Sequence, residues 1–286
     1  MPSERELRRR ARSIRNIEQV TKAMQLVAAS RMRRAQQSVL ASRPFEEKLR
    51  TVLNDLAPYA DPEISPLLRR REVKRVGIVL VTTDRGLVGS LNVNMVRAAL
   101  RFAEQQPAAS FVAVGRKGVS TIRRLRLPLT AEFTNLGDRP TTADTNVVAR
   151  VALEEFLSGA VDEVHLAFTR FVNTLRQTPT VRRLLPLVPE EEDLDQMERL
   201  QYLFEPDPET VLNAVLPRLI EVSVYQAILE SRASEQSARM VAMRNATEAA
   251  GDLISEITLA ANKARQGRIT KEMLEIASGA EALGKG

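Results

Sequence analysis

Two segments of the chain carry glycines in the setting where nucleotide-binding proteins cradle phosphate groups. They are Gly86–Ser90 (GLVGS) and Gly115–Thr121 (GRKGVST), and each closely follows a short apolar run typical of a buried strand. A P-loop requires G-x-x-x-x-G-K-[ST], and a dinucleotide site requires G-x-G-x-x-G. Neither spacing is present, so we interpret both segments as tight strand-to-helix connections and expect no bound cofactor.

The other candidate catalytic and metal-ligating residues do not form a set that acts together. His165 is the single histidine and the chain has no cysteine, which argues against a transition-metal site and excludes disulfides. We interpret His165 as a structural residue at the edge of a sheet. The pairs Glu46-Glu47 and Glu154-Glu155 are adjacent in predicted helices, where neighbouring side chains point in different directions. We expect no catalytic and no metal site.

The elements that must position these residues begin and end with long helices. Apolar residues recur every three or four positions from about residue 3 to 56 and again from 208 to 283, a period that needs a partner helix. At 1.5 Å per residue these helices would be roughly 80 Å and 110 Å long. Pro44 and Pro217 should kink them, although a helix start near Pro217 explains that proline equally well.

The predicted seams contain mostly apolar and small side chains. The N-terminal seam comprises Leu7, Ile14, Ile17, Thr21, Met24, Ala28, Met32, Ala35, Val39, Leu49, Val52 and Leu56. The C-terminal seam includes the small residues Ala238, Ala242, Ala246, Ala249, Ala260 and Ala264. Small side chains let two helix axes approach closely.

Between the helices the apolar period changes to that of strands alternating with helices. Such alternation predicts one compact α/β domain with a partly parallel sheet, over about 73–205. The predicted strands are 75–81, 111–114, 163–171 and 180–187, and the predicted helices are 91–104, 115–125 and 141–158. The acidic stretch 190–198 is interpreted as a linker or surface loop. The fold class is therefore α/β plus coiled coil.

Positive charge is concentrated at the N-terminal end of the chain. Residues 1–50 hold 13 Lys and Arg against 5 Asp and Glu, within a net charge of +6. Such a surface meets phosphates, anionic lipid or an acidic protein, or is simply a solvated helix face. Nucleic acid is not the expected partner, because no aromatic residues accompany Arg8–Arg10 and the seam runs through this region. A basic scaffold for nucleic acid or anionic membrane remains the alternative function.

No apolar run is long enough to cross a membrane, and charges at Glu4 and Arg5 stand where a signal peptide needs an apolar core. We therefore expect an intracellular protein.

The C-terminal segment Ile269–Ala282 (ITKEMLEIASGAEA) resembles the signature of the gamma subunit of F-type ATP synthases. Every position of that signature is matched. The resemblance continues in order along the chain, through Arg12–Ile17, Thr21–Met24, Val27–Ser30, Met32–Gln36, Thr83–Leu87, Ala238–Thr247 and Asn262–Gln266.

This resemblance implies a central rotor stalk of the bacterial form. Residues 1–60 and 208–286 would form an asymmetric antiparallel coiled coil inside a hexamer of alpha and beta subunits. The Rossmann-like domain 73–205 would be a foot that meets the epsilon subunit and the ring of c subunits. The chain would couple proton-driven rotation to ATP synthesis on beta without a catalytic site of its own. It would be peripheral, at the cytoplasmic face of the membrane.

The resemblance also implies roles for particular residues. Met24, with Lys22 beside it, resembles a rotor position that faces an acidic lever on beta, although Met24 also fits a seam position. Tyr202 and Glu205 resemble foot positions near the c-ring. Five polar residues resemble shaft positions that meet loops of beta: Arg239, Arg265, Gln266, Thr270 and Glu272. The alternative for Glu272 is a solvated helix face.

Overall fold

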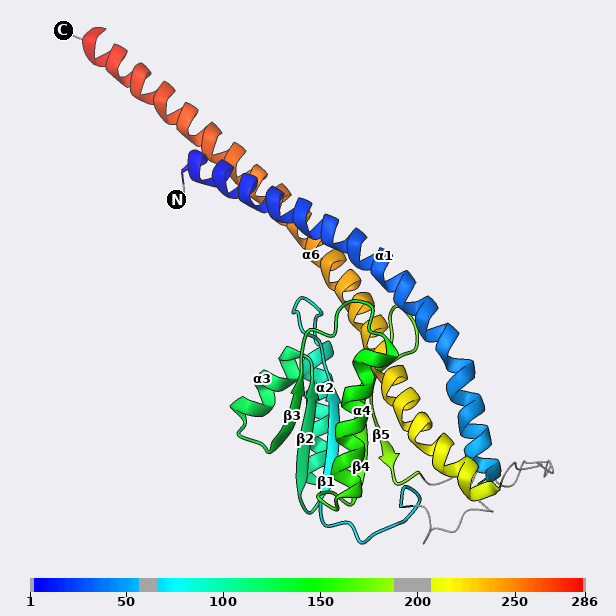
Figure 1. Ribbon diagram of the computed structural model, residues 1–286. Helices are drawn as coiled ribbons and strands as arrows, with labels where there is room; N and C mark the ends of the chain where they lie inside the picture. The colour runs from blue at the N-terminus through cyan, green and yellow to red at the C-terminus, as the bar shows by residue number, and fades with distance from the viewer. Residues whose placement is uncertain (1–2, 57–65, 188–206, 285–286) are drawn as a thin grey trace. The chain divides into compact units, whose positions relative to one another are not determined.

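The computed structural model describes residues 3–56, 66–187 and 207–284 (Figure 1). Two helices, α1 (Glu4–Leu56) and α6 (Pro208–Gly284), each contribute to two compact units. One unit is formed by Ala28–Arg239, and the other by Met1–Val27 with Met240–Gly286. Both helices continue through their internal prolines, Pro44 and Pro217. The alternative of a new helix that starts near Pro217 is therefore wrong.

The unit Ala28–Arg239 contains a five-stranded mixed sheet with the order β3-β2-β1-β4-β5. The first four of these strands are parallel, and β5 pairs with β4 in the antiparallel direction. Three helices connect the parallel strands. The elements are β1 (Val76–Val81), α2 (Leu91–Glu104), β2 (Ala109–Val114), α3 (Arg116–Arg124), β3 (Leu129–Phe133), α4 (Thr142–Leu157), β4 (Glu163–Phe171) and β5 (Gln177–Leu185).

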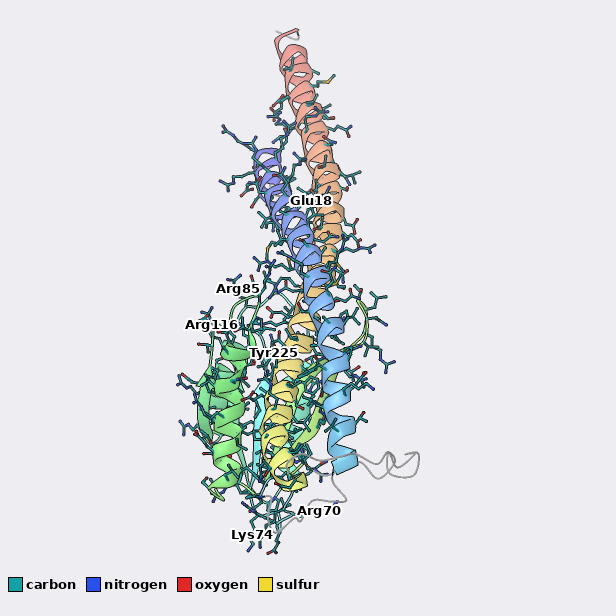
Figure 2. The ribbon with its side chains drawn as sticks, turned by 45° about the vertical axis from the view of Figure 1, so that its right-hand side comes forward. Glu18, Arg70, Lys74, Arg85, Arg116 and Tyr225 are labelled. Atoms are coloured by element: carbon teal, nitrogen blue, oxygen red, sulfur yellow. The ribbon has the colours of Figure 1, made fainter. Side chains whose placement is uncertain are left out.

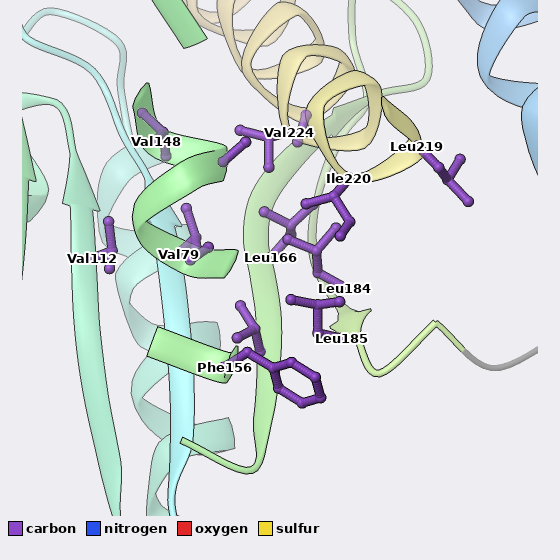
Figure 3. Close-up of a cluster of buried hydrophobic side chains, with 14 of the residues drawn as sticks. Val79, Val112, Val148, Phe156, Leu166, Leu184, Leu185, Leu219, Ile220 and Val224 are labelled. Atoms are coloured by element: carbon purple, nitrogen blue, oxygen red, sulfur yellow. The ribbon is translucent and has the colours of Figure 1, made fainter. Parts of the chain in front are cut away.

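The sheet is covered on both faces, so its central strand is apolar along its whole length. Alternate side chains of β1 enter two separate cores. Ile78 and Leu80 pack with residues of α2 and α3. Val79 and Val81 pack on the other face with residues of α4 and α6, among them Phe156 (Figure 3). Helix α6 is thus an integral part of the α/β layer.

Most of the elements predicted for the middle of the chain are confirmed, and two features are wrong or missing. The strand β3 is missing from the sequence prediction: its five side chains do alternate between half-buried and exposed, as in a strand, but the run is short and none of it is fully buried. His165 does not lie at the sheet edge, because β4 is flanked by β1 and β5. The outer strand β5 begins at Gln177 and includes Pro179, whose missing N–H is tolerated in an edge strand.

The unit formed by the two chain ends contains α1 and α6 side by side in antiparallel orientation. The Thr21 and Thr247 hydroxyls are 2.7 Å apart, and Arg268 forms an ion pair with Glu4 at 3.2 Å. Buried or half-buried side chains in this part of α1 recur every four and three residues, at Leu7, Ala11, Ile14, Glu18 and Thr21. This spacing averages 3.5 residues, as the sequence predicts for a seam.

The corresponding face of α6 differs in part from its prediction. Ala249 and Ala260 are exposed, as is Ile17 on α1, so these three residues are not in the seam. The buried or half-buried residues of α6 that keep the 3.5-residue period are Met243, Thr247, Ala250, Ile254, Ile257, Ala261 and Ala264. Residues 265–278 are all exposed. The domain boundaries 1–60, 73–205 and 208–286 stay a prediction.

Candidate functional site

The carboxyl end of β1 is connected directly to the start of α3. Thr82 Oγ1 accepts a hydrogen bond from the Gly118 N–H at 2.8 Å and donates to the Val114 carbonyl at 2.9 Å. Gly115 has φ of 93°, and a Cβ at this position would lie 2.3 Å from the Thr82 carbonyl oxygen. Only glycine allows this approach. The start of α3 is therefore occupied by groups of the chain itself.

The Asp84 carboxylate lies where doubly wound sheets bind anionic ligands, outside the carboxyl ends of the strands. It accepts hydrogen bonds from the main-chain N–H groups of Arg116 at 3.1 Å and Asn135 at 3.2 Å. Arg232 of α6 approaches it at 3.4 Å. The two glycine-bearing segments are strand-to-helix connections, as predicted, and an internal carboxylate takes the place of an anion between them.

A chain of buried charges continues from Asp84 along α6. Glu235, whose side chain is 4% exposed, accepts from Arg232 at 2.8 Å and from Arg239 at 2.8 Å. Arg239 also donates to the Gly86 carbonyl at 3.3 Å. Two carboxylates therefore balance two guanidinium groups, a condition for burying charge at tolerable cost. The structure directs Arg239, one of the predicted shaft residues, toward its own β1–α2 loop.

This network borders a cavity of about 260 Å³. The exposed side chains of Arg85 and Arg116 help to line it, and they lie at one end of the α/β domain (Figure 2). Arg31 of α1 also lines the cavity and forms an ion pair with Asp138 at 2.6 Å. The sequence signals for this region were the two glycine-bearing segments and the resemblance of Thr83–Leu87 and of Ala238–Thr247, which includes Arg239, whereas Arg232 and Glu235 on α6 gave none.

The predicted partner-binding residues at the chain ends form two groups. Lys22 is exposed and Met24 is half-buried on α1. Arg265, Gln266, Thr270 and Glu272 are exposed on α6. Because Thr21 faces Thr247 and Glu4 faces Arg268, the two groups are about 20 residues apart along the helices, or ~30 Å at 1.5 Å per residue. Tyr202 and Glu205 lie outside the described residues.

The polar side chains of the exposed group on α6 interact mainly with other residues of the same helix. The Thr270 hydroxyl donates to the Gln266 carbonyl at 3.0 Å, and Glu272 is 3.9 Å from Arg268 one turn earlier. Large apolar side chains are interspersed with these polar ones and are exposed: Ile269, Met273, Leu274 and Ile276. These apolar side chains have no cover within the described part of the chain.

His165 is buried and is a structural residue of the sheet. Its Nε2 lies 2.8 Å from Glu163 Oε2, and its ring centroid is 4.5 Å from that of Phe102 on α2. Burial lowers the pKa of His165 below its usual value, and the nearby Glu163 carboxylate only partly offsets this effect. The imidazole is therefore neutral at pH 7, and it serves packing between β4 and α2.

Within the described parts of the chain, no group of three or more His, Cys, Asp and Glu residues is arranged to hold a metal ion. No helix among these residues is long and apolar enough to cross a membrane.

Known proteins resemble this chain over almost its whole length. The sequence model of the family described as ATP synthase matches residues 3–283. The ATP synthase gamma chain of Dehalococcoides mccartyi strain CBDB1 is 50% identical over 286 residues, which cover 99% of this chain and 100% of that protein. The ATP synthase gamma chain of Roseiflexus castenholzii is 49% identical and covers 99% of both chains.

Solved structures share the fold. A chain of the Tetrahymena thermophila mitochondrial ATP synthase central stalk and c-ring structure has a TM-score of 0.61 and 28% identity, covering 79% of this chain and 99% of that one. A chain from the Euglena gracilis mitochondrial ATP synthase has a TM-score of 0.71 at 21% identity, covering 98% and 94%, and shows the fold alone. Sequence identity near 50% over almost the whole of both chains settles the family: this chain belongs to the ATP synthase gamma chains.

Proposed function

We propose that the chain is the central rotor stalk of an F-type, proton-translocating ATP synthase. It couples rotation of a c-ring to ATP synthesis or hydrolysis on beta subunits and has no catalytic site of its own. The observation that carries this proposal is the identity of about half of all residues with ATP synthase gamma chains, over the full length of both proteins. A local motif would support only one part of the chain, whereas this similarity includes both helices and the sheet.

Each part of the chain has a place in this proposal. Residues 1–60 and 208–286 form one antiparallel coiled coil that turns inside a hexamer of alpha and beta subunits. Residues 73–205 form the foot, which binds the epsilon subunit and the c-ring, and through them the chain is held at the cytoplasmic face of the membrane. The antiparallel contacts of Thr21 with Thr247 and of Glu4 with Arg268 support the first assignment.

Coupling in such a machine needs a shaft that contacts each beta subunit differently at each angle, because only differential contact shifts a conformational equilibrium. The candidates for these contacts are Lys22 and Met24 on α1 and the exposed residues 265–272 of α6. An excess of positive charge on residues 1–50 suits an acidic partner surface. Arg239 is a weaker candidate, because its guanidinium is already engaged by Glu235 and Gly86.

Co-expression with the alpha and beta subunits of the same organism tests the proposal. We expect a stable complex that hydrolyses ATP, whereas the purified chain alone hydrolyses none. A chain that does not co-purify with alpha and beta, and instead binds DNA or anionic vesicles with a steep salt dependence, would show that the basic-scaffold function is correct.

Truncation after Arg268 tests the role of the exposed end of α6. We expect the truncated chain to assemble with alpha and beta but to lower proton-driven ATP synthesis in vesicles, because the contacts of 269–282 with the hexamer are lost. The comparison is with a variant that carries only Thr258→Ala, whose hydroxyl bonds within α6 to the Ile254 carbonyl. Unchanged synthesis by the truncated chain would remove residues 269–282 from the coupling mechanism.

A further inference from the structure

Strand β4 extends beyond the end of its parallel neighbour β1. The β1 pairing ends at the pair Leu80 and Ala167, whereas the pairing with β5 continues to Phe171. The last residues of β4 therefore have one paired side and one open side. In the antiparallel ladder, main-chain groups of alternate residues point to the same side. Those of Thr169 and Phe171 point to the side that β1 has left open.

Side chains from the two long helices satisfy all four of these main-chain groups. The Thr169 N–H donates to Ser231 Oγ at 3.2 Å, and its carbonyl accepts from Ser234 Oγ at 3.1 Å. The Phe171 N–H donates to Glu230 Oε2 at 3.2 Å. The Phe171 carbonyl accepts from Arg43 of α1 at 3.2 Å.

Two of these side chains, Arg43 and Glu230, also bind to one another, and Gln226 and Ser42 extend the set across the helices. Arg43 forms an ion pair with Glu230 at 3.3 Å. Gln226 donates to Glu230 at 3.3 Å, and its amide oxygen is bound by the hydroxyl of Ser42 on α1. Helix α1, helix α6 and strand β4 are thus joined by one continuous hydrogen-bonded set.

The members of this set on α6 and β4 are shielded from water, whereas the Arg43 side chain on α1 is 35% exposed. Gln226, Glu230, Ser231 and Ser234 are all buried, as are Thr169 and Phe171 of the strand. Buried polar groups that bond to main chain impose one register, because any slip of the helix leaves them unsatisfied at a cost of the full desolvation penalty. Apolar packing alone permits sliding more readily, since it is not directional. The contacts fix α6 on the sheet both along and around its axis.

We propose that this set, the strand–helix joint of Arg43, Gln226, Glu230, Ser231 and Ser234, transmits torque between the α/β domain and the long helices. The inference rests on the proposed rotor function, in which the foot is turned by the ring and the helices turn the hexamer. The five residues are positioning residues. They hold α1 and α6 in register with β4 and take no part in the chemistry of ATP.

A double variant, Ser231→Ala with Ser234→Ala, tests the joint in the complete, membrane-reconstituted ATP synthase. Two hydrogen bonds between α6 and β4 are lost. This loss should raise the population of the state in which the open edge of β4 is separated from α6 by about thirtyfold. Hydrogen exchange of the Phe171 amide, whose acceptor Glu230 is unchanged in this variant, should accelerate by the same factor. In addition, we expect the torsional stiffness measured with a bead on the α/β domain to fall, together with the ATP formed per proton transported.

Glu230→Gln is a second variant for the case in which the double variant folds poorly. The amide oxygen still accepts from Phe171, but the charge pair with Arg43 is lost, so we expect a smaller fall in stiffness. Ser255→Ala and Glu248→Gln are matched controls, because these exposed side chains bond only within α6. Both controls should leave stiffness and coupling unchanged.

Two results would overturn the inference. One is wild-type stiffness and coupling in a double variant whose Phe171 amide exchanges faster. The other is an equal loss of coupling in the control variants. Failure of the wild-type chain to assemble with alpha and beta would instead reject the rotor function itself.

Discussion

Two stretches of the single helix α6 have opposite relations to their surroundings. Residues 216–239 are largely buried, and their polar side chains find partners on α1, on the β1–α2 loop or on β4. Residues 265–278 are exposed on all sides, although apolar side chains occur in both stretches. One continuous helix therefore contains both a stretch that is stabilised by tertiary contacts and a stretch that is not. The first stretch is held by contacts inside the chain, whereas the second leaves its apolar side chains exposed.

Replacing one leucine by alanine in each stretch should give the largest difference in the free energy of unfolding between the two stretches. Leu216 is fully buried in the core with α4 and β5, whereas Leu274 is 62% exposed. Leu216→Ala should lower the free energy of unfolding by about 2–5 kcal/mol, because it leaves a cavity. Leu274→Ala should change it by less than about 0.5 kcal/mol. Urea unfolding of the purified chain measures both.

An equal effect of the two leucine variants on urea unfolding would contradict the division of α6. A loss of coupled ATP synthesis in Leu274→Ala, without any loss of stability, would support a partner contact at the exposed end.

Neutralising a carboxylate in each stretch should give the next largest difference in the free energy of unfolding. Glu235→Gln removes the carboxylate that both Arg232 and Arg239 contact at 2.8 Å, and it leaves two buried guanidinium groups with one counter-charge. We expect a loss of about 3 kcal/mol in the free energy of unfolding. Glu275 lies 3.7 Å from Lys271, and both side chains are exposed. Glu275→Gln should therefore lower the free energy of unfolding by well under about 1 kcal/mol.

The salt dependence of these charge variants adds a control. Added salt should erase the small effect at Glu275 and leave most of the effect at Glu235, because buried pairs are screened less. Similar losses in both variants would show that the network near Asp84 is solvated.

The sequence predicts regular patterns better than irregular contacts. The 3.5-residue period located both long helices, and α2 was predicted at its observed bounds, because these patterns are local. The strand β3 carries only a five-residue alternation, in which no side chain is fully buried, and it was missed because so short a pattern is a weak signal. The joint residues Glu230, Ser231 and Ser234 were missed because polar residues on a helix normally indicate a solvated face. Their partner is the open edge of β4, about 60 residues earlier in the chain.

The titration of the only histidine gives a smaller, pH-dependent contrast. Burial holds the pKa of His165 below its value in the unfolded chain, so the unfolded chain binds a proton first as the pH falls. Stability from this residue is thus fully present above the unfolded pKa of about 6.5 and declines as the pH falls toward the folded pKa. NMR of the imidazole measures this pKa directly, without overlap from another histidine.

A His165→Gln variant should show a weaker fall in stability between pH 7.5 and 5.5 than the wild-type chain. The pH dependence that remains in the variant comes from carboxylates. A measured pKa of His165 above 6.5 would mean that the Glu163 contact outweighs burial, and the slope would then reverse its sign.

Two helical glycines give the smallest effects, and the effects should have opposite signs. A Cβ at Gly267, in the exposed stretch of α6, meets no atom within 4 Å, whereas a Cβ at Gly118 of α3 would lie 2.8 Å from Thr82 Oγ1. Gly267→Ala should therefore stabilise its helix locally by up to about 1 kcal/mol. Gly118→Ala should destabilise, because Thr82 must give up its hydrogen bond to the Gly118 N–H. Amide hydrogen exchange near residue 267 would detect the local gain, and global unfolding would stay unchanged. If Gly267→Ala instead raised the global unfolding midpoint, the exposed stretch would unfold together with the sheet, and the two stretches of α6 would not be energetically separate.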